Sequence, residues 1–374
     1  MKDKFADENV LYNLVPWSDA EFPATAEYLA NSQVALDLYR KVGQAKDKRV
    51  PYTGTNTSGF DRQYDSMLLF PASAAKKVSL GDYEGAYADL DALVDYWAVY
   101  THGAGMHFVL GIGGEMFASR YMGNIALLNE VPADVALKTI RHLETMEVGP
   151  GQLQEMFRKE SLLSPTMVDA FLNPKGSILF YDLPGWLKKR PQLFMLLTAS
   201  SRWQMQRDMD AFFGNIVFMA GQPYDHARLT KFEDQLNPYL SRSQVLVKTA
   251  DPPGYVAAGM YAPFVSAVIT NCYRTTASLR MTELVLAVRQ FQQSEKRLPS
   301  DLNELIPKYL ASVPLDPFDS KPLRYKVKQD GSWIIYSVDK NQVDDGGTKG
   351  LDLIFSSTAP ADELEQVKKS RKKK

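Results

Sequence analysis

The spacing of apolar residues divides the chain into a long helical part and a short part in which residue types alternate. Before Pro299, apolar residues recur three or four positions apart, which is the spacing of one face of an α-helix. Apolar and polar residues alternate only after Pro317, and alternation predicts strands. We therefore expect an α+β protein, with a mainly α-helical body of helical hairpins and a small antiparallel three-stranded unit near the C-terminus.

The clearest helical pattern lies in residues 83–101. Asp82 precedes it as an N-cap, and apolar side chains then recur on one continuous face. The run Gly81-Asp82-Tyr83 resembles the start of a tetratricopeptide helix pair, but no second copy follows at the period of that repeat. We therefore predict one antiparallel hairpin with residues 67–78. The other expected helices are residues 21–42, 115–128, 134–146, 152–161, 165–172, 191–213, 224–240 and 263–294. Both faces of the helix at 191–213 are rather apolar, so we expect this helix to be central, with Trp203 and several methionines in the core.

The strongest break in this pattern is the run Ala250–Tyr255, which holds two consecutive prolines and a glycine. The long helix expected after it leads directly into the C-terminal strands. The sequence therefore predicts an α-helical body at 1–262, a long helix with a small antiparallel sheet at 263–357, and a basic flexible tail at 358–374. Because the long helix can pack on both the body and the sheet, these two parts need not be independent domains.

Residues 316–319 are expected to form a turn, because Pro317 fixes its own φ and moves Asp316 out of the helical region. Three strands are expected near the C-terminus, at residues 323–328, 332–338 and 351–355. Asp330-Gly331 separates the first two and is a strong hairpin signal, because glycine tolerates the positive φ of such turns. The second strand has apolar residues on both faces, which predicts that both faces are covered.

An acidic loop joins the second and third strands. It holds Asp339, Asn341, Asp344, Asp345 and Asp352, together with three glycines. Ca²⁺ binds six to eight oxygen atoms in a flexible shell, and this loop could supply them. Aspartate, asparagine and glycine are also turn formers, so an ordinary solvated loop has the same composition. The residues alone leave both interpretations open.

The order of residues in the C-terminal region resembles a known family. The runs Arg297–Leu302, Val313–Phe318, Pro322–Tyr325 and Tyr336–Val338 are similar to the C-terminal region of major pseudopilins of type II secretion systems. The whole chain also resembles a broad set of uncharacterised bacterial envelope proteins, in which a helical body precedes the same tail. Phe318 stands where the pseudopilins have tryptophan, and Asn341 stands where they have aspartate.

This resemblance implies a metal site, a location and a role. The family's loop aspartates lie eleven positions apart, as Asn341 and Asp352 do here, which implies one Ca²⁺ held by Asp339, Asn341, Asp344, Asp345 and Asp352. Pseudopilins carry an N-terminal membrane helix, so we expect such an anchor to precede this chain in its natural form. The protein would then lie on the extracytoplasmic side of a bacterial membrane, in the periplasm or envelope, and bind other proteins of an envelope or secretion-type assembly.

Charge is distributed unevenly along the chain. The net charge is −1, and removing the six positive charges of Lys368–Lys374 leaves −7 for the rest. A negative body argues against nucleic-acid binding, which requires an extended basic surface. We interpret the basic end as a solvated terminus, although it could also touch an anionic surface. Cys272 is the only cysteine, so an internal disulfide is excluded.

A glycine-rich stretch with two histidines lies at residues 102–114. His102 and His107 lie five positions apart, a spacing that separates them on a helix, and the glycines between 103 and 114 match no phosphate-binding pattern. We interpret the small residues as a means for two helices to pack closely, with the histidines at a bend.

Two functions from different classes remain. Scattered carboxylates such as Glu115, Glu144 and Glu155 could pair as acid and base, which would make the helical body a hydrolase. The alternative is a non-catalytic, envelope-associated component of an assembly, in which helical hairpins bind another protein. We favour the second because of the pseudopilin-like tail. A deep polar pocket with convergent carboxylates would favour the enzyme, and an apolar groove would favour the binding protein.

Overall fold

The computed structural model describes residues 16–46, 60–103, 105–146, 148–172, 191–236 and 253–360. Within these ranges the chain forms eleven helices and one small antiparallel sheet, so the predicted α+β class is confirmed. None of the helices in these ranges has the combination of length and apolar composition that spanning a membrane requires. The predicted tail at 358–374 lies outside the described residues from 361 onward, as do Ala250, Asp251 and Pro252 of the predicted break.

The chain folds as two compact units. The first consists of Met1–Val148 together with Tyr273–Lys374, and the second is Gly149–Cys272. Helix α15 (Pro253–Glu295) contributes to the second unit up to Cys272 and to the first unit from Tyr273. This division differs from the boundaries predicted at 262 and 357. The apolar pattern of a continuous helix does not indicate where the helix passes from one packed unit to the other.

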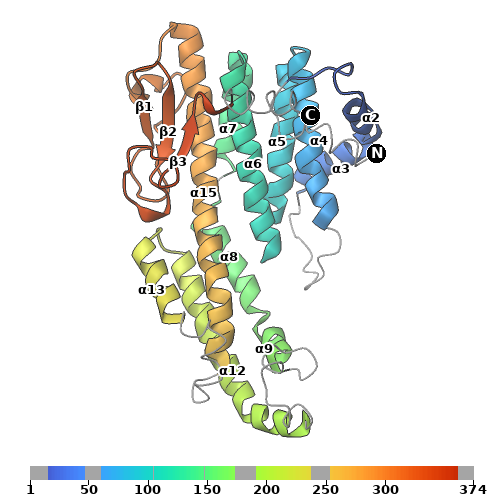
Figure 1. The fold of residues 1–374 in the computed structure, drawn as a ribbon, viewed down its shortest axis with the longest axis vertical. Helices are drawn as coiled ribbons and strands as arrows, with labels where there is room; N and C mark the ends of the chain where they lie inside the picture. Colours follow the sequence, from blue (N-terminus) through green and yellow to red (C-terminus); the bar gives the residue numbers. More distant parts are fainter. Residues whose placement is uncertain are drawn as a thin grey trace, which may run out of the picture. The chain divides into compact units, whose positions relative to one another are not determined.

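The first unit is built on helices α2 (Pro23–Asn31), α3 (Gln33–Gly43), α4 (Phe60–Ser79), α5 (Tyr83–Tyr100), α6 (Met106–Leu128) and α7 (Ala133–Glu144). Helix α5 packs against α3, α4, α6 and α7, and Figure 1 shows α4, α5 and α6 side by side. The predicted apolar face of α5 is buried, from Tyr87 to Trp97. Asp82 caps this helix by accepting a hydrogen bond from the Gly85 amide at 2.8 Å, as predicted.

Several helix ends differ from the prediction. The helix expected at 21–42 is interrupted at Ser32, and α6 begins at Met106 instead of Glu115. The glycine-rich stretch therefore lies inside α6. A Cβ built on Gly114 would lie 2.1 Å from Cγ of Trp97, so glycine lets α5 and α6 approach closely, as expected from the sequence. Helix α15 begins at Pro253 instead of residue 263, because proline is well suited to the first turn of a helix.

The second unit contains α8 (Pro150–Ser161), α9 (Ser164–Leu172), α12 (Pro191–Ala220), α13 (His226–Leu236) and the first part of α15. Helix α12 packs against α8 and α9 and buries Met205, Met209 and Phe213. Trp203 was expected in the core, but its side chain is 71% exposed and lies beside the guanidinium of Arg207. The prediction was wrong there because both faces of α12 are apolar in sequence, which left the buried face undefined.

The sheet consists of β1 (Arg324–Val327), β2 (Trp333–Ser337) and β3 (Leu353–Ser356), in that spatial order and antiparallel throughout. Tyr325 pairs with Ile335, and Ile335 pairs with Phe355. Every residue of β2 is buried, which confirms that both of its faces are covered. Figure 1 shows the sheet beside α15. The loops of the sheet contact the part of α15 that follows Cys272 through the ring pair Tyr273–Phe318 and through a hydrogen bond from Arg280 to the Leu315 carbonyl.

Candidate functional site

Asp339 of the acidic loop forms an ion pair with α15. It begins the short 3₁₀-helix η4 (Asp339–Asn341) and is 7% exposed. Nε of Arg274 donates to one carboxylate oxygen and Nη2 donates to the other, each at 2.7 Å. A bidentate pair of this kind is among the stronger ionic contacts in proteins. Both oxygens of Asp339 are therefore engaged with Arg274, so this side chain fits the predicted calcium shell poorly.

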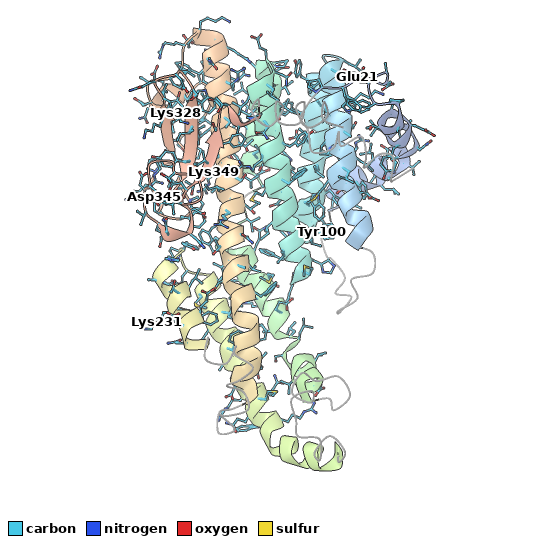
Figure 2. All side chains as sticks on the ribbon, viewed as in Figure 1. Glu21, Tyr100, Lys231, Lys328, Asp345 and Lys349 are labelled. Atoms are coloured by element: carbon cyan, nitrogen blue, oxygen red, sulfur yellow. The ribbon has the colours of Figure 1, made fainter. Side chains whose placement is uncertain are left out.

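Asn341 and Asp345 contact each other. The amide nitrogen of Asn341 donates to the Asp345 carboxylate at 2.8 Å, and its amide oxygen accepts from the Val343 amide at 3.1 Å. Figure 2 shows Asp345 and Lys349 in this loop beside the sheet. The loop is thus closed by hydrogen bonds between the same side chains that the sequence offered as ligands.

Asp344 connects the loop to the sheet. It accepts hydrogen bonds from the Tyr336 hydroxyl at 3.1 Å and from the Gly346 amide at 3.0 Å, and it lies 3.7 Å from Nε of Arg324. Burial, reinforced by Asp344, raises the pKa of the Tyr336 hydroxyl to about 12. The side chain of Asp344 is half exposed, so it remains accessible to a ligand.

Asp352 is the one predicted ligand with an unsatisfied oxygen. It is 6% exposed, and its Oδ2 accepts from the amides of Gly347 at 2.8 Å and Thr348 at 2.9 Å. Its Oδ1 is buried without a hydrogen-bond partner. Among the described residues, no three histidine, cysteine, aspartate or glutamate side chains lie close enough together to hold a metal ion. The calcium prediction therefore requires the loop to rearrange around Asp352.

A buried carboxylate that the sequence showed only as part of a turn organises this region. Asp316 is 0% exposed and accepts from the Phe318 amide at 3.0 Å, the Val338 amide at 2.9 Å and the Ser337 hydroxyl at 2.9 Å. Arg324 completes the set through Nη1 at 2.7 Å. Burial raises the pKa of the Asp316 carboxyl, while these hydrogen bonds and Arg324 act in the opposite direction. One side chain thus joins the Leu315–Phe318 turn to the first two strands.

The carboxylates of the hydrolase alternative lie in different environments. Glu115 is 1% exposed within α6, whereas Glu144 is exposed at the last residue of α7. Glu155 belongs to the second unit and lies 3.7 Å from Arg158. The two histidines have local contacts, since His102 Nδ1 lies 3.0 Å from the Ala98 carbonyl and the His107 ring stacks on Tyr100.

The first unit contains an apolar cleft of about 530 Å³. It is formed by residues of α4 and α6 and by the end of β3 with the segment that follows. Arg120 is the one charged residue among the described residues of its lining; it donates to the Ile354 carbonyl at 3.1 Å and lies 5.0 Å from the Phe355 ring centre. The lining consists of Met67, Val109, Leu110, Gly113, Met116, Phe117, Arg120, Tyr121, Asn124, Phe355, Ser356, Ala359 and Pro360.

Comparison with known proteins gives no family for this chain. It matches no protein-family model, no curated protein and no solved structure. The resemblance to pseudopilins therefore rests on the residues of the C-terminal region and stays a prediction.

Proposed function

We propose that the protein is a non-catalytic component of a bacterial envelope assembly and that it binds a partner protein through the apolar cleft. The observation that carries this proposal is the composition of the cleft, in which apolar side chains such as Leu110, Met116 and Phe117 predominate and Arg120 is the single charged residue described. An apolar groove of this kind suits an amphipathic helix better than it suits acid–base chemistry.

The position of Arg120 defines the partner's chemistry further. Its guanidinium is held at one side of the cleft by the Ile354 carbonyl and the Phe355 ring. A guanidinium is positively charged and forms its strongest hydrogen bonds with carboxylates. The partner segment is therefore an apolar helix face with one aspartate or glutamate placed beside Arg120.

The C-terminal sheet supplies the fixed wall of this cleft. Phe355 of β3 lies over Gly123 of α6, where an added Cβ would come within 2.5 Å of the Phe355 ring. The Asp316 network fixes the first two strands, and β2 pairs with β3 along its length. This gives the pseudopilin-like region a role in shaping the binding surface.

The location and the calcium site belong to the same proposal. We place the protein on the extracytoplasmic side of a bacterial membrane, as the resemblance to pseudopilins implies. Ca²⁺ would bind Asn341, Asp344, Asp345 and Asp352, with Asp339 left to Arg274. The buried, unsatisfied Oδ1 of Asp352 is the observation that favours a cation, since such an oxygen is costly to leave without a partner.

Affinity capture from a bacterial envelope fraction tests the proposal. Leu110→Asp places a charge in the cleft, and Leu80→Asp places the same charge at a side chain that is 74% exposed and outside it. We expect the unchanged protein and Leu80→Asp to retain the same envelope protein, identified by mass spectrometry, and Leu110→Asp to lose it. Equal capture by all three would contradict binding through the cleft. Turnover of a metabolite that Glu115→Gln abolishes would favour the hydrolase instead.

A further inference from the structure

Helices α5 and α7 face each other with a series of paired charges. Near one end, Lys138 lies 4.0 Å from Glu84, and near the other, His142 Nε2 lies 3.3 Å from Asp95. Asp91 lies between these two acidic residues on α5 and has no such pair. The positions 84, 88, 91 and 95 share one face of α5 because they are separated by three or four residues. The middle of the series thus holds a carboxylate that forms no direct ion pair, although His142 and Lys138 both act on its charge.

Two polar atoms at this position have no hydrogen bond. Oδ1 of Asp91 is buried without a partner, and so is Oγ1 of Thr139, whose residue is 1% exposed. Both residues line a small pocket of about 130 Å³ between the helices. A buried carboxylate oxygen and a buried hydroxyl without partners each cost free energy, so their coincidence at one pocket points to a bound group.

We propose that this pocket binds a small primary ammonium group, with Asp91 and Thr139 as its two inner hydrogen-bond acceptors. An ammonium group has three donors and no acceptor. The carboxylate of Asp91 and the hydroxyl oxygen of Thr139 accept two of its hydrogen bonds, and Glu84 or Asp134 at the pocket accepts the third. The remaining lining residues are Tyr87, Ala88, Val135 and Lys138.

The chemistry of the lining favours an organic cation over other ligands. Three carboxylates and one lysine line the pocket, so its net charge repels anions when the carboxylates are ionised. A metal ion would require several ligands close to one point, and the described residues contain no such group of acidic or histidine side chains. The volume exceeds the ~15 Å³ that one water requires, and it accommodates an ammonium group with a short alkyl chain.

The protonation state of the Asp91 carboxyl determines the pH range in which the pocket binds an ammonium group. Burial raises the pKa of Asp91 to about 6, with Asp95 acting in the same direction and His142 and Lys138 against it. An ammonium group binds the ionised carboxylate, so affinity is higher at pH 7.5 than at pH 5. The other titratable groups that face Asp91 from the two helices are Glu84, Tyr87, Asp95, Asp134, Lys138 and His142.

Titration with methylammonium, followed by amide chemical shifts, tests the site. We expect saturable shifts in α5 and α7, at least tenfold weaker binding by Asp91→Asn, and weaker binding by Thr139→Val, which keeps the shape of the side chain. Glu144→Gln removes one charge from an exposed residue of α7 outside the pocket and should bind as the unchanged protein does.

The outcomes separate a site from a pocket that holds only water. Trimethylammonium, which has a single N–H donor, should bind at least tenfold more weakly than methylammonium. The proposal is overturned if no saturable shift occurs in the millimolar range at pH 7.5. It is equally overturned if Asp91→Asn and Glu144→Gln bind methylammonium alike. Thr139→Val removes only an unsatisfied hydroxyl, so we expect this variant to fold. If Asp91→Asn does not fold, the affinity of Thr139→Val for methylammonium tests the site instead.

Discussion

Arg324 donates a hydrogen bond at 2.7 Å to the carboxylate of Asp316, a residue with no exposed surface that lies eight positions earlier in the chain. The same carboxylate accepts from the backbone of Phe318 and Val338, so a single side chain fixes a turn, a strand and the end of a second strand. Residues 316, 324 and 337 are therefore joined in one hydrogen-bond network.

Removing the buried carboxylate tests this network. Asp316→Ala should destabilise the protein by about 3–5 kcal/mol, because it removes one of the two carboxylates that pair with Arg324 and leaves the buried amides of Phe318 and Val338 without their acceptor. The free energy of unfolding from urea titration measures the effect. Lys328→Ala, at an exposed position of the same hairpin, should change it by less than about 0.5 kcal/mol. Equal effects of the two substitutions would show that the network contributes nothing specific.

Two neighbouring glycines of α6 provide a matched pair. An added Cβ on Gly114 would lie 2.1 Å from the Trp97 ring, whereas one on Gly113 would meet nothing within 4 Å. We expect Gly114→Ala to destabilise the protein by about 1–3 kcal/mol and Gly113→Ala to stabilise it by about 0.5–1 kcal/mol. Thermal melts compare them directly, and the close packing of α5 and α6 would be refuted if both alanines were stabilising.

The pocket between α5 and α7 should make stability depend on pH. Burial raises the folded-state pKa of Asp91 to about 6 from 3.8, so the folded protein binds this proton more tightly than the unfolded chain does. Stability from this group therefore falls as pH rises from about 4 to about 6, by up to about 3 kcal/mol. The pKa of His142 is raised, chiefly by Asp95, so its contribution is complete below its unfolded pKa and is lost as pH rises through its folded one.

Asp91→Asn separates these two contributions. The variant should show a flatter free energy of unfolding between about pH 4 and pH 6 and a higher one at neutral pH, because no ionised carboxylate is then buried. The fall at higher pH that arises from His142 should remain. Urea titrations at a series of pH values measure both. An unchanged pH profile in Asp91→Asn would exclude Asp91 as the titrating group.

Calcium should stabilise the protein if the acidic loop binds it. The melting temperature should rise with Ca²⁺ and fall with a chelator, and a hundredfold excess over Kd corresponds to about 2.7 kcal/mol. Asp352→Asn should abolish this rise. Asp339→Asn should lower the melting temperature by breaking the pair with Arg274, yet keep the calcium-dependent rise. If the melting temperature does not respond to calcium, the acidic loop is an ordinary solvated loop and the calcium prediction is wrong.

Features with a local cause were predictable from the sequence. The face of α5, the Asp82 cap, the Asp330-Gly331 hairpin and the buried second strand follow from spacing and turn chemistry, and the structure has all of them. The sequence also predicted that the glycines before Glu115 allow two helices to pack closely, as Gly114 does for α5 and α6. It did not predict that their helix begins at Met106.

Features that depend on distant residues were not predictable. Asp339 is held by Arg274, which lies 65 positions away, so nothing in the loop itself indicated that this carboxylate was already paired. Asp316 looked like a turn residue because its partners come from two later strands. Trp203 was assigned to the core from its type alone, since an apolar pattern on both faces of a helix does not identify the buried one.

Site-specific photo-crosslinking in the bacterial envelope tests the central claim most directly. A photoreactive residue at Leu110, inside the cleft, is compared with one at Leu80, which is exposed and outside it. Binding through the cleft predicts one crosslinked envelope protein at position 110, attached through an apolar helix that carries an aspartate or glutamate, and none at position 80. No crosslink at 110, or the same crosslinks at both positions, would contradict it.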